Sequence, residues 1–129
     1  MYVLVVENIK QIQTQMRTAL EGSAVPASFA GGWNEAVQIV NQMGAPIALV
    51  TNVDLGQRLD GFSLAYELRR KSPAMPTLFV SATRWDVVRG IVSKQDSFLL
   101  KPFDAAAFAN KLRGILQQAL APTVQSKQA

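Results

Sequence analysis

Short apolar runs alternate along this chain with longer segments whose apolar residues recur at helical spacing, and this alternation constrains the fold more than any other feature. The runs have the β-forming, continuously apolar composition of strands that are buried on both faces. Five such strands are predicted, at residues 2–6, 25–30, 46–51, 75–80 and 97–100. A helical segment follows each of them. We therefore predict an α/β fold in which one parallel sheet lies between two layers of helices.

The helical segments carry several specific expectations. Asn8 is predicted to cap the first helix, which ends at Gly22. The third helix is expected over residues 61–71, with the inward residues Phe62, Ala65, Tyr66 and Leu68. A short helix is predicted over residues 85–92. The last helix has a predicted core stripe made of Phe108, Leu112, Ile115 and Leu116.

The chain is expected to form one domain over residues 1–121, followed by a polar, disordered tail at residues 122–129. Hydrophobic residues make up 49% of the sequence and charged residues 17%, a balance that supports a single folded core. Pro26 interrupts the second predicted strand, and this favours an edge position for that strand because proline cannot donate a backbone hydrogen bond.

Cysteine and histidine are both absent from the chain. Without cysteine there are no disulfides, no thiol nucleophile and no cysteine-based zinc site. Without histidine, the commonest general base and the commonest transition-metal ligand are also missing. Any chemistry must therefore use carboxylates, hydroxyls, amides, lysine and arginine.

Charge is distributed unevenly along the chain. The formal net charge is +4, but residues 1–64 contribute −2 and residues 65–129 contribute +6. No Lys/Arg-rich run is interleaved with aromatic residues, so we expect no direct contact with nucleic acid. No apolar run approaches the ~20 residues that cross a bilayer, and the N-terminus does not resemble a signal peptide. We expect a cytoplasmic protein without a membrane partner.

In parallel sheets of this kind, ligands bind beyond the carboxyl ends of the strands. The side chains that follow the predicted strands are therefore the candidate pocket residues. They are Glu7, Asn8, Asn52, Asp54, Ser81 and Lys101.

Four motifs that stand in order along the chain resemble the receiver domain of two-component response regulators. They are Val-Val-Glu-Asn at residues 5–8, Asn-Val-Asp-Leu-Gly at 52–56 with Asp-Gly-Phe at 60–62, Val-Ser-Ala at 80–82, and Phe-Leu-Leu-Lys-Pro-Phe at 98–103. The resemblance covers residues 2 to about 120. It implies a flavodoxin-like three-layer α/β/α sandwich with strand order 2-1-3-4-5. It also places Ser81 at the position of the switch hydroxyl and Phe98 at that of the switch aromatic.

The departures from this family are concentrated in the pocket. Asn52 stands where the family has the phospho-acceptor aspartate, and an amide cannot form an acyl phosphate. Glu7 and Asn8 replace the acidic pair that binds Mg²⁺, an ion that favours charged oxygens. We therefore expect a pseudo-receiver with no metal site, in which Glu7 contacts Lys101. The side chain of Asp54 is expected to point away from the pocket.

The leading hypothesis is a signalling module, not an enzyme, that binds a protein partner without Mg²⁺-dependent aspartyl phosphorylation. The partner would be a histidine kinase, an output domain or a second receiver, and a homodimer is possible. The alternative is a phosphorylatable receiver that uses Mg²⁺ and either Asp54 or a native aspartate at position 52. A flavin-binding, flavodoxin-like protein is a remote third hypothesis, because the acidic Glu7 would repel a phosphate.

The basic C-terminal half suggests where a partner would dock. In the receiver family, the face made by the fourth helix, fifth strand and fifth helix commonly carries the signal. The candidate interface combines basic, aromatic and small residues, and Trp85 is expected to be an exposed recognition residue. The set comprises Arg84, Trp85, Arg89, Lys94, Ala105 and Ala109.

Overall fold

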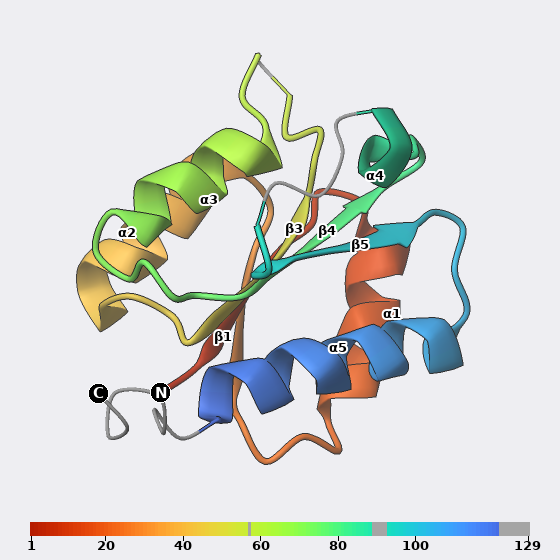
Figure 1. Ribbon diagram of the computed structural model, residues 1–129, viewed down its shortest axis with the longest axis horizontal. Coiled ribbons are helices and arrows are strands. Elements are labelled where there is room, and N and C mark those ends of the chain that lie inside the picture. Colours follow the sequence, from red (N-terminus) through yellow and green to blue (C-terminus); the bar gives the residue numbers. More distant parts are fainter. Residues whose placement is uncertain (57, 89–92, 122–129) are drawn as a thin grey trace.

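The computed structural model describes residues 1–56, 58–88 and 93–121. Within these residues, five parallel strands form one sheet in the order β2-β1-β3-β4-β5 (Figure 1). The strands are β1 (Val3–Val6), β2 (Ala27–Ala30), β3 (Ala48–Asn52), β4 (Thr77–Ser81) and β5 (Asp96–Leu100). The helices are α1 (Lys10–Leu20), α2 (Trp33–Met43), α3 (Gly61–Arg69), α4 (Trp85–Val88) and α5 (Ala105–Leu120). The predicted sheet and strand order are confirmed, including the edge position of the second strand.

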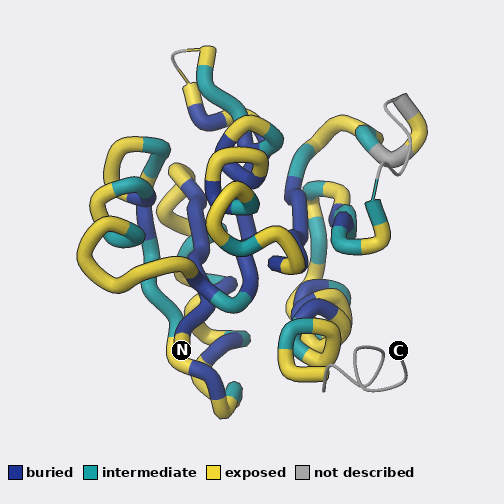
Figure 2. Tube along the Cα trace, turned by 60° about the vertical axis from the view of Figure 1, so that its left-hand side comes forward, coloured by how far each residue is buried: buried dark blue, intermediate teal, exposed yellow. Residues whose placement is uncertain are grey.

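The strands direct alternate side chains into two hydrophobic cores, one on each face of the sheet. In β1, Leu4 and Val6 join the core covered by α2 and α3, whereas Val3 and Val5 join the core covered by α1 and α5. All four residues are completely buried. Figure 1 shows the two helix pairs on opposite sides of the sheet, and Figure 2 shows the buried trace running between exposed helical surfaces. Burial on both faces explains why these strands are continuous apolar runs.

Two of the helix predictions are wrong, and in both cases contacts in the folded protein decide the outcome. The N-cap of α1 is Ile9 and not Asn8. The side chain of Asn8 instead accepts a hydrogen bond from Asn52, 44 residues away along the chain. Tyr66 is predicted to face inward but is 70% exposed, because α3 turns Leu64 towards the sheet in its place.

The predicted fourth helix is described only in part. α4 covers Trp85–Val88, while residues 89–92 lie outside the described residues, as does the predicted tail at 122–129. In the described part of the chain, no helix combines the length and the apolar character that crossing a membrane requires.

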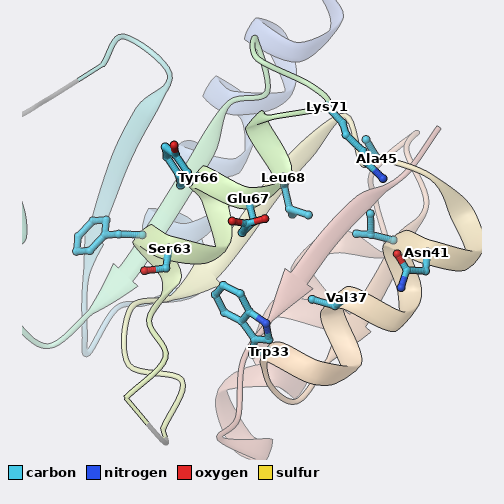
Figure 3. A pocket seen from close by; sticks show the side chains of 11 residues that line it. Trp33, Val37, Asn41, Ala45, Ser63, Tyr66, Glu67, Leu68 and Lys71 are labelled. Carbon is cyan, nitrogen blue, oxygen red and sulfur yellow. The ribbon is translucent and has the colours of Figure 1, made fainter.

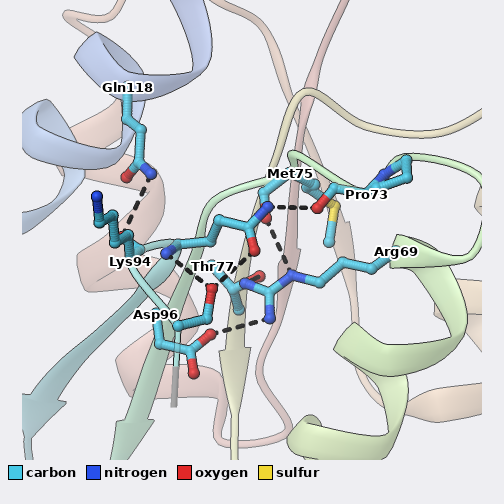
Figure 4. A network of polar contacts seen from close by, with 9 residues as sticks. Arg69, Pro73, Met75, Thr77, Lys94, Asp96 and Gln118 are labelled. Atoms are coloured by element: carbon cyan, nitrogen blue, oxygen red, sulfur yellow. Dashed lines mark hydrogen bonds and ion pairs between the residues drawn. The ribbon is translucent and has the colours of Figure 1, made fainter. Parts of the chain in front are cut away.

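A polar network fixes the edge of the sheet at which β4 and β5 begin (Figure 4). The Arg69 guanidinium, at the end of α3, donates to Asp96 Oδ1 at 2.9 Å, to Thr77 Oγ1 at 3.1 Å and to the carbonyl oxygen of Met75 at 3.1 Å. The side chains of Arg69 and Asp96 are only 19% and 3% exposed. One guanidinium therefore joins α3 to two neighbouring strands through a largely buried ion pair.

Replacing Arg69 should destabilise the fold far more than replacing its neighbour Arg70. Arg69→Leu leaves the buried Asp96 carboxylate without its cation, which should lower the free energy of unfolding by about 3–5 kcal/mol. Arg70 meets Glu67 at 3.4 Å, with both side chains exposed, so Arg70→Leu should change it by at most ~1 kcal/mol. Urea denaturation followed by circular dichroism measures both. Equal losses in the two variants would contradict the structural role assigned to Arg69.

Candidate functional site

The predicted pocket residues gather where the carboxyl ends of the strands meet. Glu7 follows β1, Asn52 ends β3 and Lys101 follows β5. β1 and β3 are direct neighbours in the sheet, whereas β3 and β4 separate β1 from β5. A contact between Glu7 and Lys101 therefore has to cross this edge of the sheet.

Glu7 and Lys101 form the predicted ion pair. Lys101 Nζ lies 3.0 Å from Glu7 Oε1, and the two side chains are 13% and 0% exposed. Lys101 Nζ and Glu7 Oε1 interact as an ion pair without the geometry of a hydrogen bond. The other carboxylate oxygen, Oε2, accepts a hydrogen bond from the backbone N–H of Ile9 at 3.0 Å. The carboxylate is thus engaged on both oxygens, and its charge is cancelled within the chain.

Asn52 and Asn8 form a second pair beside the first. Asn52 Nδ2 donates to Asn8 Oδ1 at 2.9 Å, and Asn52 is 7% exposed. The two positions at which the resemblance implies carboxylates are therefore joined by a neutral amide contact. Two carboxylates at this distance would repel each other unless a cation lay between them.

The remaining acidic residues of the neighbouring loop are engaged with backbone. Asp54 is exposed, and its Oδ1 accepts from the N–H of Gly56 at 3.0 Å. Asp60 caps α3 by accepting from the N–H of Ser63 at 2.7 Å. Both carboxylates hold the shape of the loop that connects β3 to α3.

Ser81 and Trp85 interact with each other, and the expectation of an exposed Trp85 is wrong. Trp85 is half-buried, and its indole Nε1 donates to Ser81 Oγ at 3.2 Å. Ser81 Oγ also accepts from the N–H of Thr83 at 3.1 Å. Phe98 is half-buried and packs against Phe79, with ring centroids 5.5 Å apart.

The pocket residues do not fit the Mg²⁺ ion that the receiver resemblance implies. Mg²⁺ favours charged oxygens in near-octahedral geometry. The Glu7 carboxylate is taken by Lys101 and Ile9, and the Asn8 oxygen by Asn52. Within residues 1–56, 58–88 and 93–121, no three His, Cys, Asp or Glu side chains come together in a group that could hold a metal ion. The arrangement is neutral without an ion.

The candidate interface residues do not all share one surface. Arg84 and Lys111 line a cavity of about 260 Å³ together with Leu100 of β5. Ala109 instead lines a cavity of about 490 Å³ together with Ala19 of α1. Of the other members, Lys94 and Ala105 are exposed, Trp85 is half-buried, and Arg89 lies outside the described residues.

A cavity of about 710 Å³ lies between α2 and α3, away from the predicted pocket (Figure 3). Trp33 and Val37 line it from α2, and Tyr66 and Glu67 line it from α3. Trp33 also packs against the core. Glu67 is paired with Arg70.

Gly61 is a site residue whose role the sequence analysis missed. Its N–H donates to the carbonyl oxygen of Val53 at 2.7 Å, which brings the start of α3 against the end of β3. A Cβ at this position would lie 2.5 Å from the carbonyl oxygen of Asn52 and 2.9 Å from Thr51 Cγ2. Its place directly after the capping Asp60 was the available signal.

Known proteins resemble this chain in sequence and in fold. The sequence model of the response regulator receiver domain matches residues 3–113. The transcriptional regulatory protein TrcR of Mycobacterium tuberculosis is 28% identical over 118 residues, which cover 90% of this chain and 45% of TrcR. The chain therefore spans less than half the length of that relative.

Solved structures show the same fold at lower sequence identity. A two component transcriptional regulator AraC from Clostridium phytofermentans superimposes with a TM-score of 0.80 at 21% identity, covering 93% of this chain and 95% of that one. NtrX from Brucella abortus gives a TM-score of 0.78 at 22% identity, covering 100% of this chain but 30% of NtrX.

Adding a methyl group at Gly61 should disturb the end of β3. Gly61→Ala forces the Asn52 carbonyl or the helix start to move, which should lower the free energy of unfolding by about 1–3 kcal/mol. Gly114→Ala is the matched control, because that exposed position of α5 has open space around a Cβ and should gain up to ~1 kcal/mol of stability. Urea denaturation compares the two. A neutral or stabilising Gly61→Ala would contradict the close approach.

Proposed function

Because the chain belongs to the family of response regulator receiver domains, we propose that it is a signalling module that acts through protein contacts without Mg²⁺-dependent phosphorylation of an aspartate. The observation that carries this proposal is the Glu7–Lys101 ion pair beside the Asn8–Asn52 amide pair. Together these contacts complete the pocket with the chain's own side chains. The module is not an enzyme, and it works in the cytoplasm.

The chemistry of phosphoryl transfer supports this proposal. Transfer needs an oxygen nucleophile and cations next to the negatively charged phosphoryl oxygens. In receivers an aspartate is the nucleophile, and Mg²⁺ and a lysine supply the positive charge. Asn52 supplies an amide that already donates a hydrogen bond to Asn8, and the charge of Lys101 is cancelled by Glu7. The chain lacks the nucleophile, the carboxylates of the metal site and an unpaired lysine charge in the pocket. Restoring one of these three is therefore insufficient for phosphorylation.

The phosphorylatable alternative lacks a comparable observation. The Asp54 carboxylate is exposed and accepts a hydrogen bond from the N–H of Gly56 in its own loop, whereas the Lys101 ammonium group is paired with Glu7. A flavin fits no better, because the negative charge of the Glu7 carboxylate, directly after β1, would repel that ligand's phosphate.

Receiver domains in two-component systems interact with kinases or output domains, and we propose a partner of this kind or a second copy of the chain. The basic residues Arg84 and Lys94 are exposed on the side of β5 and α4. A second copy is a specific candidate because residues 1–64 carry −2 and residues 65–129 carry +6, so two copies could place opposite charges together.

Restoring the nucleophile alone should not restore phosphorylation. After incubation with acetyl phosphate and Mg²⁺, intact mass spectrometry should show no phosphoryl adduct on the wild type and only a trace on Asn52→Asp. The triple variant Glu7→Asp, Asn8→Asp, Asn52→Asp regains the carboxylate set and should be phosphorylated at least tenfold faster than the single variant, or about 1.4 kcal/mol in activation free energy. Titration calorimetry should show saturable Mg²⁺ binding in the triple variant alone.

Two results would refute this interpretation. One is an adduct on the wild type, which would support Asp54 as acceptor and can be located by the loss of the adduct in Asp54→Asn. The other is an Asn52→Asp variant as active as the triple variant, which would mean that the pocket needs only its nucleophile.

Association between copies through the basic residues Arg84 and Lys94 should weaken as salt rises. Sedimentation velocity at low and high ionic strength should show dimers at low salt for the wild type. Arg84→Glu with Lys94→Glu should abolish them. Lys10→Glu with Lys71→Glu changes the same charge on other exposed positions and should retain them. A wild type that stays monomeric at low salt would exclude a second copy as the partner.

A further inference from the structure

Trp85 joins the loop after β4 to the hydroxyl at the end of that strand. Its indole N–H donates to Ser81 Oγ at 3.2 Å, and the N–H of Thr83 donates to the same oxygen at 3.1 Å. A serine hydroxyl oxygen has two acceptor lone pairs, and both are used here. Rotation of the Ser81 side chain towards the pocket would break both hydrogen bonds at once.

Aromatic packing holds the indole in the same place. The ring of Trp85 meets that of Phe62 edge-on, with centroids 5.6 Å apart. Phe62 packs on Phe79 at 4.7 Å, and Phe79 packs on Phe98 at 5.5 Å. Phe79 is 2% exposed, so this row of rings runs from the start of α4 into the buried face of the sheet.

We propose that Trp85 is a positioning residue that fixes the loop between β4 and α4 in one conformation. The indole does this in two ways, since its N–H donates a hydrogen bond to Ser81 and its ring packs against Phe62. The hydroxyl at residue 81 and the aromatic ring at residue 98, which the family resemblance assigns to a switch, are then both parts of one static cluster. The surface next to Arg84 then keeps one shape, because the loop beneath it does not change conformation.

This inference deepens the proposed function, because a module that is not switched by phosphorylation needs a defined surface. It rests on different atoms, however, and its test uses no phosphoryl donor. The outcome at Trp85 and the outcome of the mass measurement can therefore differ.

Hydrogen exchange of the indole proton tests the contact directly. The chain has two tryptophans, Trp33 and Trp85, so a ¹⁵N–¹H spectrum should show two indole signals, and Trp33→Phe assigns them. Ser81→Ala removes the acceptor, and the Trp85 indole proton should then exchange about three- to tenfold faster. Ser81→Thr keeps the hydroxyl oxygen and should restore slow exchange.

A second pair of variants tests the loop itself. Trp85→Phe keeps an aromatic ring but lacks the N–H, and the Thr83 amide should exchange several-fold faster. Trp33→Phe makes the same change on α2 and should leave that amide unaffected. The amide of buried Val50 reports whether the core is intact in each variant.

Two observations would overturn the proposal. The first is equal exchange of the Trp85 indole proton in the wild type, Ser81→Ala and Ser81→Thr. The second is a pair of Trp85 indole signals in the wild type, which would show two loop conformations. If Ser81→Ala weakens the core at Val50, the comparison of Trp85→Phe with Trp33→Phe decides the matter at Thr83.

Discussion

A carboxylate that is completely shielded from water needs a compensating cation, and Glu7 finds one in the ammonium group of Lys101. Burying an unpaired charge would cost several kcal/mol, so this contact governs the whole carboxyl edge of the sheet. It connects the ends of β1 and β5, which are separated by two strands. Glutamate is one methylene longer than aspartate, which extends its reach towards Lys101. The lysine therefore provides the positive charge that a metal would otherwise have to provide.

The amide pair follows from the same electrostatic constraint. Once Lys101 is neutralised by Glu7, no spare positive charge remains in the pair to stabilise carboxylates at positions 8 and 52. Asparagine at both positions removes the repulsion and replaces it with a direct hydrogen bond of 2.9 Å. The three departures from the receiver pattern, Glu7, Asn8 and Asn52, are therefore mutually consistent. Each of them lowers the electrostatic free-energy cost of the other two. A single aspartate introduced at position 52 would be placed beside a site with no cation to receive it.

Features that depend on strand periodicity could be predicted from the sequence, whereas features that depend on one distant partner could not. Continuous apolar runs are enough to predict a parallel sheet, and the resemblance of the motifs to the receiver family implies the strand order and the Glu7–Lys101 contact. Asn8 is of a residue type that favours helix caps, but Asn52, 44 residues away along the chain, forms a hydrogen bond with its side chain. Trp85 has polar sequence neighbours and would be exposed by that criterion, yet Phe62 and Ser81 bring its indole inward. Gly61 lies directly after the capping Asp60, but the close approach that requires a glycine depends on the end of β3, where the Asn52 carbonyl lies.

The two sets of contacts act on opposite sides of the acceptor position. On one side, Glu7 and Asn8 connect β1 to β5 and β3; on the other, Ser81 and Trp85 connect β4 to α4. A receiver that responds to phosphorylation must have weakly held groups on both sides, because the ligand can shift an equilibrium only by the difference in its contacts with the two states. Here the groups that would have to move are already satisfied within the chain. Under the proposed function, one arrangement is therefore populated, and a partner that fits this arrangement would bind without first having to select it from several.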